Sequence, residues 1–351
     1  MLKFSGEKLK TPVFLHMSNT HISSWANEKP SFRILSLCGG GMNGAIAAGI
    51  LKTIEDTLDT KTAEHFDLIV GTSTGGILAL GLALGIPAMS LSDFYHSRGE
   101  KVFPSSAGGT WGCLRNLFRS KYSAEGLKTE LQSVFQDRVL GDCRVPVVIP
   151  AYNLSENKVQ MFKTRHHSRF EIDYKIAAWK VARATSAAPT FLPACREIAQ
   201  AQLIDGGVFA NNPIMVGVTE ALGVFGVAAS DIEILSIGTT KAVRRHCRQL
   251  DNAGVALWGP RIADLFSDAQ ASICMSQAML LVGKEHILHI DPEVAEGEFR
   301  LDRYQPDRHQ SLAADCARHN IPEIRRRFFS TPAVIGRNAL QNPIGGLQHA
   351  A

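Results

Sequence analysis

The segment from residue 66 to residue 84 constrains the fold of this chain more than any other. An apolar run at 66–70 predicts a short buried strand, and a second run at 77–84 predicts a helix. Between them, residues 71–75 read Gly-Thr-Ser-Thr-Gly, a Gly-x-Ser-x-Gly pattern. A strand, a sharp turn and a helix in this order are the setting of a nucleophile elbow, which holds Ser73 clear at the end of a strand.

The glycines of this turn have a steric role. The turn pushes Ser73 into a strained backbone conformation, and the residues on either side of it crowd each other. We expect Gly71 and Gly75 to be needed there because they have no Cβ atom to clash. The alternative interpretation is a glycine-rich turn in which Ser73 only caps the helix.

A second unit of the same kind precedes the elbow. A predicted strand at 32–37 leads into Cys-Gly-Gly-Gly-Met-Asn-Gly at 38–44, and residues 45–58 have helical spacing. Consecutive glycines let several N–H groups point at one spot, so we expect an oxyanion hole from Gly39, Gly40 and Gly41. The spacing of Gly39, Gly41 and Gly44 also fits a dinucleotide-binding turn, but that fold needs an acid after the second strand, where this chain has the elbow.

A carboxylate is the best candidate for the base that activates Ser73. A short strand at 202–204 ends in Asp205, which Gly206 and Gly207 follow. A partly buried carboxylate in contact with the serine can take its proton, although Asp205 could instead cap a turn. None of the twelve histidines sits in a compelling strand-end setting: His166 and His167 follow a predicted strand and His65 precedes one, and we interpret all three as ordinary surface residues.

The composition excludes several classes of protein. The chain is 45% hydrophobic and 20% charged with a net charge of +4, which is globular and too weakly basic to indicate nucleic acid. Seven scattered cysteines indicate reduced thiols, and no metal-binding spacing is present. The N-terminus does not look like a secretory signal. The apolar windows 75–89 and 271–283 are interrupted or too short to cross a bilayer, so we expect a cytoplasmic protein that meets lipid only from the water side.

Further elements follow the same periodicity rules. We expect helices at 124–135, 174–183, 215–224 and 263–281, and strands at 145–152, 159–163, 232–237 and 286–290. Residues 99–110 have loop composition, and the basic and aromatic segment 111–121 is compatible with a membrane interface or with a lid. We divide the chain into an N-terminal arm (1–31), a core (32–240) and a mostly helical C-terminal extension (241–351) packed on the same domain.

Taken together, three motifs resemble those of the patatin-like phospholipases. They are the glycine run at 38–44, the elbow at 71–76 and the Asp-Gly-Gly motif at 205–213, and the stretches 182–191 and 236–239 also resemble that family. The resemblance covers residues 32–240. It implies a three-layer α/β/α fold with a central, mostly parallel sheet, and a Ser–Asp dyad hydrolase that needs no metal or cofactor. Ser73 matches the nucleophile, Asp205 the base, and Gly39, Gly40 and Gly41 the oxyanion hole.

The resemblance leaves the control of the enzyme open. The family commonly has Asp before the glycine run and Arg at the second-to-last position of the motif, where this chain has Cys38 and Asn43. The substrates implied are acyl esters of membrane glycerophospholipids, reached at the inner face of the membrane. Some bacterial relatives are anti-phage effectors activated by cyclic nucleotides, so a cyclic di- or trinucleotide activator and a homo-oligomer are partners to test. A constitutive lipid acyl hydrolase and a non-catalytic lipid-binding protein are the alternatives.

Overall fold

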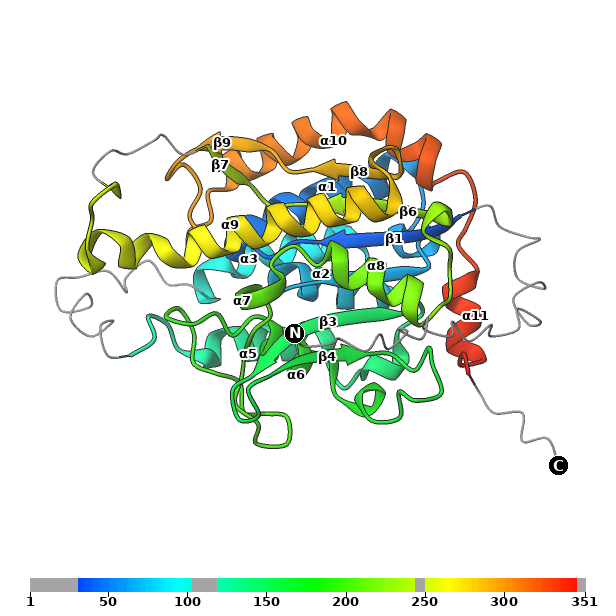
Figure 1. Cartoon of the computed structure of the whole chain (residues 1–351), viewed down its shortest axis with the longest axis horizontal. Coiled ribbons are helices and arrows are strands. Elements are labelled where there is room, and N and C mark those ends of the chain that lie inside the picture. The colour runs from blue at the N-terminus through cyan, green and yellow to red at the C-terminus, as the bar shows by residue number, and fades with distance from the viewer. Residues whose placement is uncertain (1–30, 103–118, 244–249, 346–351) are drawn as a thin grey trace, which may run out of the picture. The chain divides into compact units, whose positions relative to one another are not determined.

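A mostly parallel sheet runs through the middle of the described chain (Figure 1). The computed structural model describes residues 31–102, 119–243 and 250–345. Among these residues the strands follow the order β4-β3-β2-β1-β6-β8, and β5 pairs with β3 outside this path. The strands of this sheet are β1 (Phe32–Leu37), β2 (Leu68–Gly71), β3 (Val147–Asn153), β4 (Lys158–Lys163), β5 (Leu203–Asp205), β6 (Ile232–Ile237) and β8 (Ile287–Ile290). A separate pair consists of β7 (Lys241–Val243) and β9 (Glu293–Ala295).

The register of the strands aligns the loops that follow them. Strand β1 lies parallel to both β2 and β6, and Leu37 stands opposite Gly71 on one side and Ile237 on the other. The carboxyl ends of these three strands therefore reach the same edge of the sheet. Strands β4 and β5 run antiparallel to β3, so β5 approaches this edge from the opposite direction.

Helices cover both faces of the sheet (Figure 1). Helices α1, α2 and α10 pack on one face, and α8 and α9 pack on the other. The helices are α1 (Gly44–Leu58), α2 (Thr74–Ala83), α3 (Ala88–Val102), α5 (Ala124–Phe135), α6 (Ala178–Thr185), α7 (Gly207–Ala210), α8 (Ile214–Gly223), α9 (Val255–Val282), α10 (Pro306–Phe328) and α11 (Ile335–Gln341).

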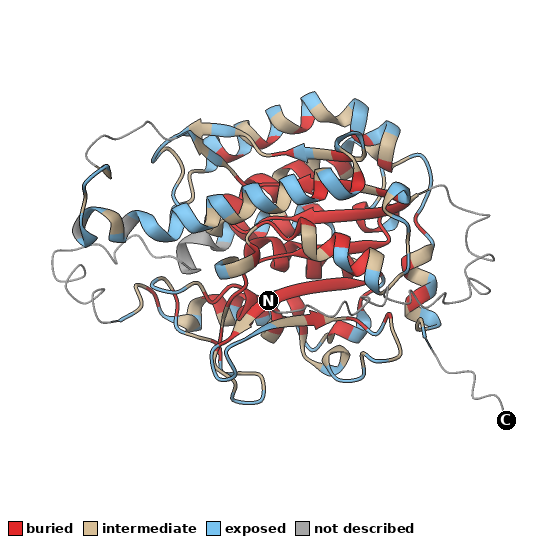
Figure 2. Ribbon diagram, viewed as in Figure 1, coloured by how far each residue is buried: buried red, intermediate tan, exposed pale blue. Residues whose placement is uncertain are grey.

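The central strand shows how two apolar layers arise from one sequence. Side chains alternate across a strand, so Leu35 and Leu37 enter the layer with α1 and α2, whereas Ile34 enters the layer with α8. Every residue of β1 is buried, as Figure 2 shows for the middle of the sheet. This covering of both faces explains why the parallel strands read as continuous apolar runs. The expected three-layer α/β/α fold is confirmed.

Most element boundaries lie within three residues of those expected from the periodicity of the sequence, and two helices, α6 and α9, differ by more. Strands β1 and β6 and helix α5 have the expected bounds. The helix expected at 174–183 begins later, at Ala178, after a separate turn at Asp173–Lys175. The cause is a loop contact, because Ile176 is extended and its carbonyl accepts a hydrogen bond from Leu140.

Helix α9 is longer than the apolar window predicted. The stretch Arg261–Val282 is long and apolar enough to cross a membrane by length and composition alone, and 11% of its most apolar window is buried. The statement that this region is too short to span was therefore wrong. Residues 99–102 of the expected loop at 99–110 belong instead to helix α3, so that part of the prediction was wrong. The rest of that loop, residues 111–118 of the basic and aromatic segment 111–121, and residues 1–30 of the arm lie outside the described residues.

Candidate active site

The turn after β2 has the geometry of a nucleophile elbow. Ser73 has φ 54° and ψ −123°, a conformation that L-residues rarely adopt. A Cβ atom on Gly75 would collide with the carbonyl oxygen of Leu37, and one on Gly71 would collide with that of Gly75. The chain can therefore make this turn only with glycine at both positions.

Neighbouring segments hold the strained residue in place. The Ser73 N–H donates to Thr185 Oγ1 at 2.9 Å, and the Thr185 hydroxyl donates to the carbonyl of Pro150 at 2.6 Å. The Thr72 hydroxyl donates to the carbonyl of Ala210 at 2.6 Å. These contacts come from three distant segments, which is how a fold maintains a backbone conformation that costs energy locally.

The two predicted reactive side chains meet. Ser73 Oγ donates to Asp205 Oδ2 at 2.6 Å, and Asp205 Oδ1 accepts the N–H of Gly207 at 2.7 Å. Ser73 occupies the N-cap position of α2, but its side chain makes no cap hydrogen bond. Asp205 does cap its own turn, yet it does so with one oxygen only. The other oxygen is left for the serine.

Strand register explains this meeting of residues far apart in the sequence. In the parallel pair β2–β3, Val70 stands opposite Val148. Three residues further along β3, Ala151 stands opposite Asp205, and Ser73 likewise follows Val70 by three residues. The antiparallel strand β5 thus ends level with the elbow.

Burial changes the proton affinity of the dyad. Ser73 is 9% exposed and Asp205 is 5% exposed. Burial raises the pKa of Asp205 to about 6, although the hydrogen bonds from Ser73 and Gly207 act in the opposite direction. A carboxylate with a pKa near 6 is ionised at neutral pH but holds a proton far better than an ordinary aspartate does. This is the property that a general base needs.

The glycine run lies against the elbow. A Cβ atom on Gly39 would be 3.3 Å from the Cβ of Ser73, and one on Gly40 would collide with Thr239. Gly41 has φ 56°, and a Cβ there would collide with the carbonyl of Leu301. The run is therefore a backbone surface beside the serine.

The amides of this run are not equivalent. Gly39 N–H donates to the carbonyl of Asn211 at 2.9 Å, so the expectation that it faces an oxyanion is corrected for this conformation. Within the described part of the chain, the amides of Gly40 and Gly41 have no hydrogen-bond acceptor.

The remaining motif glycines have packing roles. Gly44 touches the Thr74 side chain, and Gly206 lies against the carbonyl of Pro150. Gly207 supplies the N–H that Asp205 accepts, as described above.

Asn43 is held by a polar network in place of a charged contact. Asn43 is 3% exposed, and its side-chain N–H donates to Thr240 Oγ1 at 3.4 Å. Its Oδ1 lies 3.2 Å from Nε2 of the buried His309 on α10, and Nδ1 of the same ring lies 2.8 Å from the carbonyl oxygen of Gln305. A carbonyl oxygen only accepts, so the His309 ring donates to Gln305 from Nδ1. Burial lowers the pKa of His309, which favours the neutral ring.

The histidines differ from the sequence interpretation. His65 and His166 are buried, so describing them as surface residues was wrong; His167 is half-buried. His166 Nε2 lies 2.8 Å from Glu220 Oε1, and the His166 ring stacks on Phe225 with 5.2 Å between centroids. None of these three side chains has a hydrogen bond to Ser73 or Asp205 among the described residues.

Thr185 is a site residue that the motif analysis did not single out. It belongs to the small-residue stretch at 182–191, where the sequence indicated only close packing. Its hydroxyl links the elbow to β3, and the only sequence signal was the resemblance of that stretch to the family. The described residues contain no group of three or more His, Cys, Asp or Glu side chains that could hold a metal ion.

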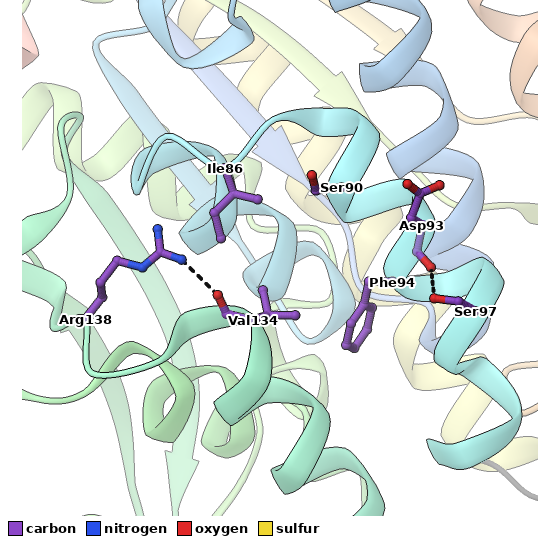
Figure 3. Close-up of a pocket in the computed structure, with 7 residues that line it drawn as sticks. All are labelled: Ile86, Ser90, Asp93, Phe94, Ser97, Val134 and Arg138. Atoms are coloured by element: carbon purple, nitrogen blue, oxygen red, sulfur yellow. Dashed lines mark hydrogen bonds between the residues drawn. The ribbon is translucent and has the colours of Figure 1, made fainter.

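Two cavities lie away from the dyad. One of about 280 Å³ lies between α3 and α5 and is lined by Ser90, Asp93 and Arg138 among others (Figure 3). Arg138 donates there to the carbonyl of Val134 at 2.8 Å. The second, of about 380 Å³, is lined by residues that do not include Ser73 or Asp205 either. These cavities supply exposed polar residues that can serve as controls for the site.

Comparison with known proteins gives a family and several relatives. The family model described as "Patatin-like phospholipase" matches residues 35–218. A "cGAMP-activated phospholipase" of Pseudomonas aeruginosa is 37% identical over 252 residues, which are 69% of this chain and 73% of that protein. Proteins with the same description from Escherichia coli and Vibrio cholerae are 37% and 36% identical over 61% and 60% of this chain. The matches cover 64% and 65% of those two proteins, slightly less than two thirds of their length.

Proposed function

The chain belongs to the patatin-like phospholipase family, and from this membership we propose that it hydrolyses acyl esters of membrane phospholipids through Ser73 and Asp205. The observation that carries the proposal is the 2.6 Å hydrogen bond from Ser73 Oγ to Asp205 Oδ2. A serine hydroxyl is a poor nucleophile until a base takes its proton, and in the described residues Asp205 is the base in contact with it.

The proposed reaction runs in two halves. Asp205 takes the Ser73 proton while the serine oxygen bonds to the ester carbonyl carbon, which places negative charge on the carbonyl oxygen. The N–H groups of Gly40 and Gly41 stabilise this charge. The bond to the lysolipid oxygen then breaks, and that oxygen takes the proton from Asp205. Water attacks the acyl-enzyme by the same route and releases the fatty acid.

A cyclic nucleotide is the proposed control of this reaction. The three relatives described as cGAMP-activated are the basis for this part of the proposal. The dyad is assembled but almost covered, because Ser73 is only 9% exposed. An ester carbonyl has to touch Ser73 Oγ, so an opening step has to precede catalysis. Binding of an activator such as cGAMP would supply the free energy for that step.

The alternatives predict different behaviour. A constitutive hydrolase would open on contact with lipid and would respond to no nucleotide. A non-catalytic lipid-binding protein would have no reason to keep a carboxylate buried against a strained serine, since both features cost stability. The short hydrogen bond between the two side chains therefore favours an enzyme. The proposed place of action is the inner face of the membrane.

The test is fatty acid release from vesicles of mixed phospholipids, measured by mass spectrometry with and without cGAMP. We expect fatty acid release by the unchanged chain to rise with cGAMP. The rates of Ser73→Ala and Asp205→Asn with cGAMP should be at least about a thousandfold lower than that of the unchanged chain. Ser90→Ala and Asp93→Asn are the matched controls, because both residues are exposed at the cavity of Figure 3.

Each outcome separates the alternatives. Unreduced release by Ser73→Ala would contradict the dyad. Equal rates with and without cGAMP would keep the hydrolase and reject nucleotide control. Vesicle binding without any fatty acid release under either condition would favour a lipid-binding protein.

A further inference from the structure

Helix α9 carries a long apolar stripe that nothing in the described chain covers. Its large members are between 43% and 86% exposed. They are Val255, Ile262, Phe266, Ile273 and Leu280, which we call the α9 stripe. Figure 2 shows most of the helix surface as exposed, although the helix lies across the sheet. Contiguous exposed apolar surface of this length on a protein in water indicates an interaction site.

The stripe has the spacing of a helix-pairing seam. Together with small exposed residues, its members follow one another in alternating steps of four and three residues through the whole helix. The small members are Gly259, Ala269 and Ser276. The positions flanking the seam carry no charge, and the three charged residues of the helix, Arg261, Asp264 and Asp268, lie off the seam. This is the a/d pattern by which one helix packs knobs into the holes of another.

The opposite face of the helix excludes a transmembrane role in this fold. Ala278 and Val282 are buried against the sheet in one apolar cluster with Ile34 and Val218. If α9 moved into a bilayer, the apolar side chains of this cluster that belong to the sheet and to α8 would become exposed. Although the stretch Arg261–Val282 has the length for a span, its C-terminal half is part of the protein core.

Two kinds of partner remain for the α9 stripe, a bilayer surface and another protein, and the charge of the helix distinguishes between them. A helix that lies on an anionic bilayer carries lysine or arginine on its polar face. Helix α9 has one basic residue, Arg261, against two acidic ones, Asp264 and Asp268. This balance disfavours a bilayer surface, whereas a protein partner that offers a second apolar seam needs no such charge.

We propose that the α9 stripe binds the α9 stripe of a second copy of this chain, with the two helices antiparallel and crossing near Ala269. An antiparallel pair about a twofold axis makes the patch its own partner, as closed symmetry requires. Centred on Ala269, this arrangement places Phe266 and Ile273 of opposite copies side by side. Towards the ends of the seam it sets large residues against small ones, with Ile262 facing Ser276 and Leu280 facing Gly259.

The size of the seam sets the strength of the dimer. A helix of 28 residues is about 40 Å long, and a contact strip about 10 Å wide covers roughly 400 Å² of each copy. The total of roughly 800 Å² is below the size of stable permanent interfaces. The dimer is therefore reversible and depends on concentration.

The same helix touches the segment that follows Asp205. Gln270 Oε1 accepts the N–H of Asn212 at 3.3 Å, and α9 packs against α7. Pairing of α9 thus fixes a helix that supports the Asp-Gly-Gly turn. The dimer proposal itself does not depend on the proposed activity.

Sedimentation velocity of the full chain from about 1 µM to about 100 µM tests the proposal over the range of weak association. We expect a monomer–dimer equilibrium, and Phe266→Glu and Ile273→Glu should weaken it at least roughly tenfold because each places an unpaired carboxylate in the seam. The matched control is Leu257→Glu, on the same helix and similarly exposed but on the side away from the seam. It should dimerise as the unchanged chain does.

Thermal unfolding and vesicle flotation complete the test. Both seam variants should keep the melting temperature of the Leu257→Glu chain, since all three residues are exposed. A chain that stays monomeric at every concentration overturns the proposal, as does equal weakening by Leu257→Glu. If the chain is monomeric and only the seam variants lose vesicle binding, the stripe is a lipid surface and the proposal is wrong.

Discussion

The buried carboxylate of Asp205 should make the protein less stable at neutral pH than a variant that lacks the charge. Its pKa rises from 3.8 to about 6 on folding because burial disfavours the ionised form. Each unit of this increase in pKa corresponds to about 1.4 kcal/mol, so ionised Asp205 lowers the free energy of unfolding by about 3 kcal/mol. Asp205→Asn removes this cost, although it also changes the hydrogen bonds of the dyad.

The pH dependence isolates the charge from the lost hydrogen bonds. Because the folded-state pKa is raised, the favourable contribution is complete below the unfolded pKa of 3.8 and is lost as pH rises through about 6. The difference in unfolding free energy, Asp205→Asn minus the unchanged chain, should therefore increase by roughly 1.4 kcal/mol from about pH 5 to about pH 8. Hydrogen-bond differences shift this gap by a constant amount only.

Urea unfolding of both chains across this pH range measures the gap, with Asp93→Asn as the control at an exposed carboxylate. Activity provides a second readout, since kcat/KM of the unchanged chain should rise with pH to half its plateau near pH 6, the pKa of the base. A gap that is constant with pH would refute the reasoning, because Asp205 would then titrate alike in the folded and unfolded chains.

Two further residues give separate tests. Thr185→Ala removes the acceptor of the Ser73 N–H and should lower kcat about tenfold with KM little changed, since one buried hydrogen bond is worth about 1 to 1.5 kcal/mol; steady-state kinetics on vesicles with an unchanged kcat would contradict this. Glu220→Gln leaves Lys163 and His166 without their carboxylate and should lower the unfolding free energy by about 3 kcal/mol in urea. Its control is Glu156→Gln, which breaks an exposed ion pair and should cost less than about 0.5 kcal/mol.

The sequence predicted those parts of the site that depend on neighbours along the chain. The elbow follows from a local pattern, because Gly71, Ser73 and Gly75 lie within one turn and their sterics are fixed there. The alternation of β1 side chains between the two apolar layers is local in the same sense. That Ser73 and Asp205 meet required the family resemblance, since no periodicity in the sequence gives the pairing of β3 with β5.

Other features depend on tertiary contacts that the sequence does not reveal. His166 is buried because Glu220 and Phe225, more than fifty residues away, meet its ring. The Gly39 amide is occupied because the chain after Asp205 returns to place the carbonyl of Asn211 beside it. The exposed side of α9 could not be predicted either, because an apolar helix in a sequence of this kind normally packs against the core on its apolar face.

The topology also explains why an aspartate can serve where many serine hydrolases use histidine. Parallel strands β1, β2 and β6 bring their carboxyl ends to one edge, where loops carry the serine and the glycine run. Strand β5 runs antiparallel to β3 at this edge, so its last residue, Asp205, lies level with Ser73. Asp205 therefore contacts the serine from the strand itself and not from a loop. A short side chain on a rigid strand reaches the serine directly, and a slip of one residue in this pairing would turn it to the other face of the sheet. The pairing of β3 with β5 is thus as much a part of the site as the motif itself.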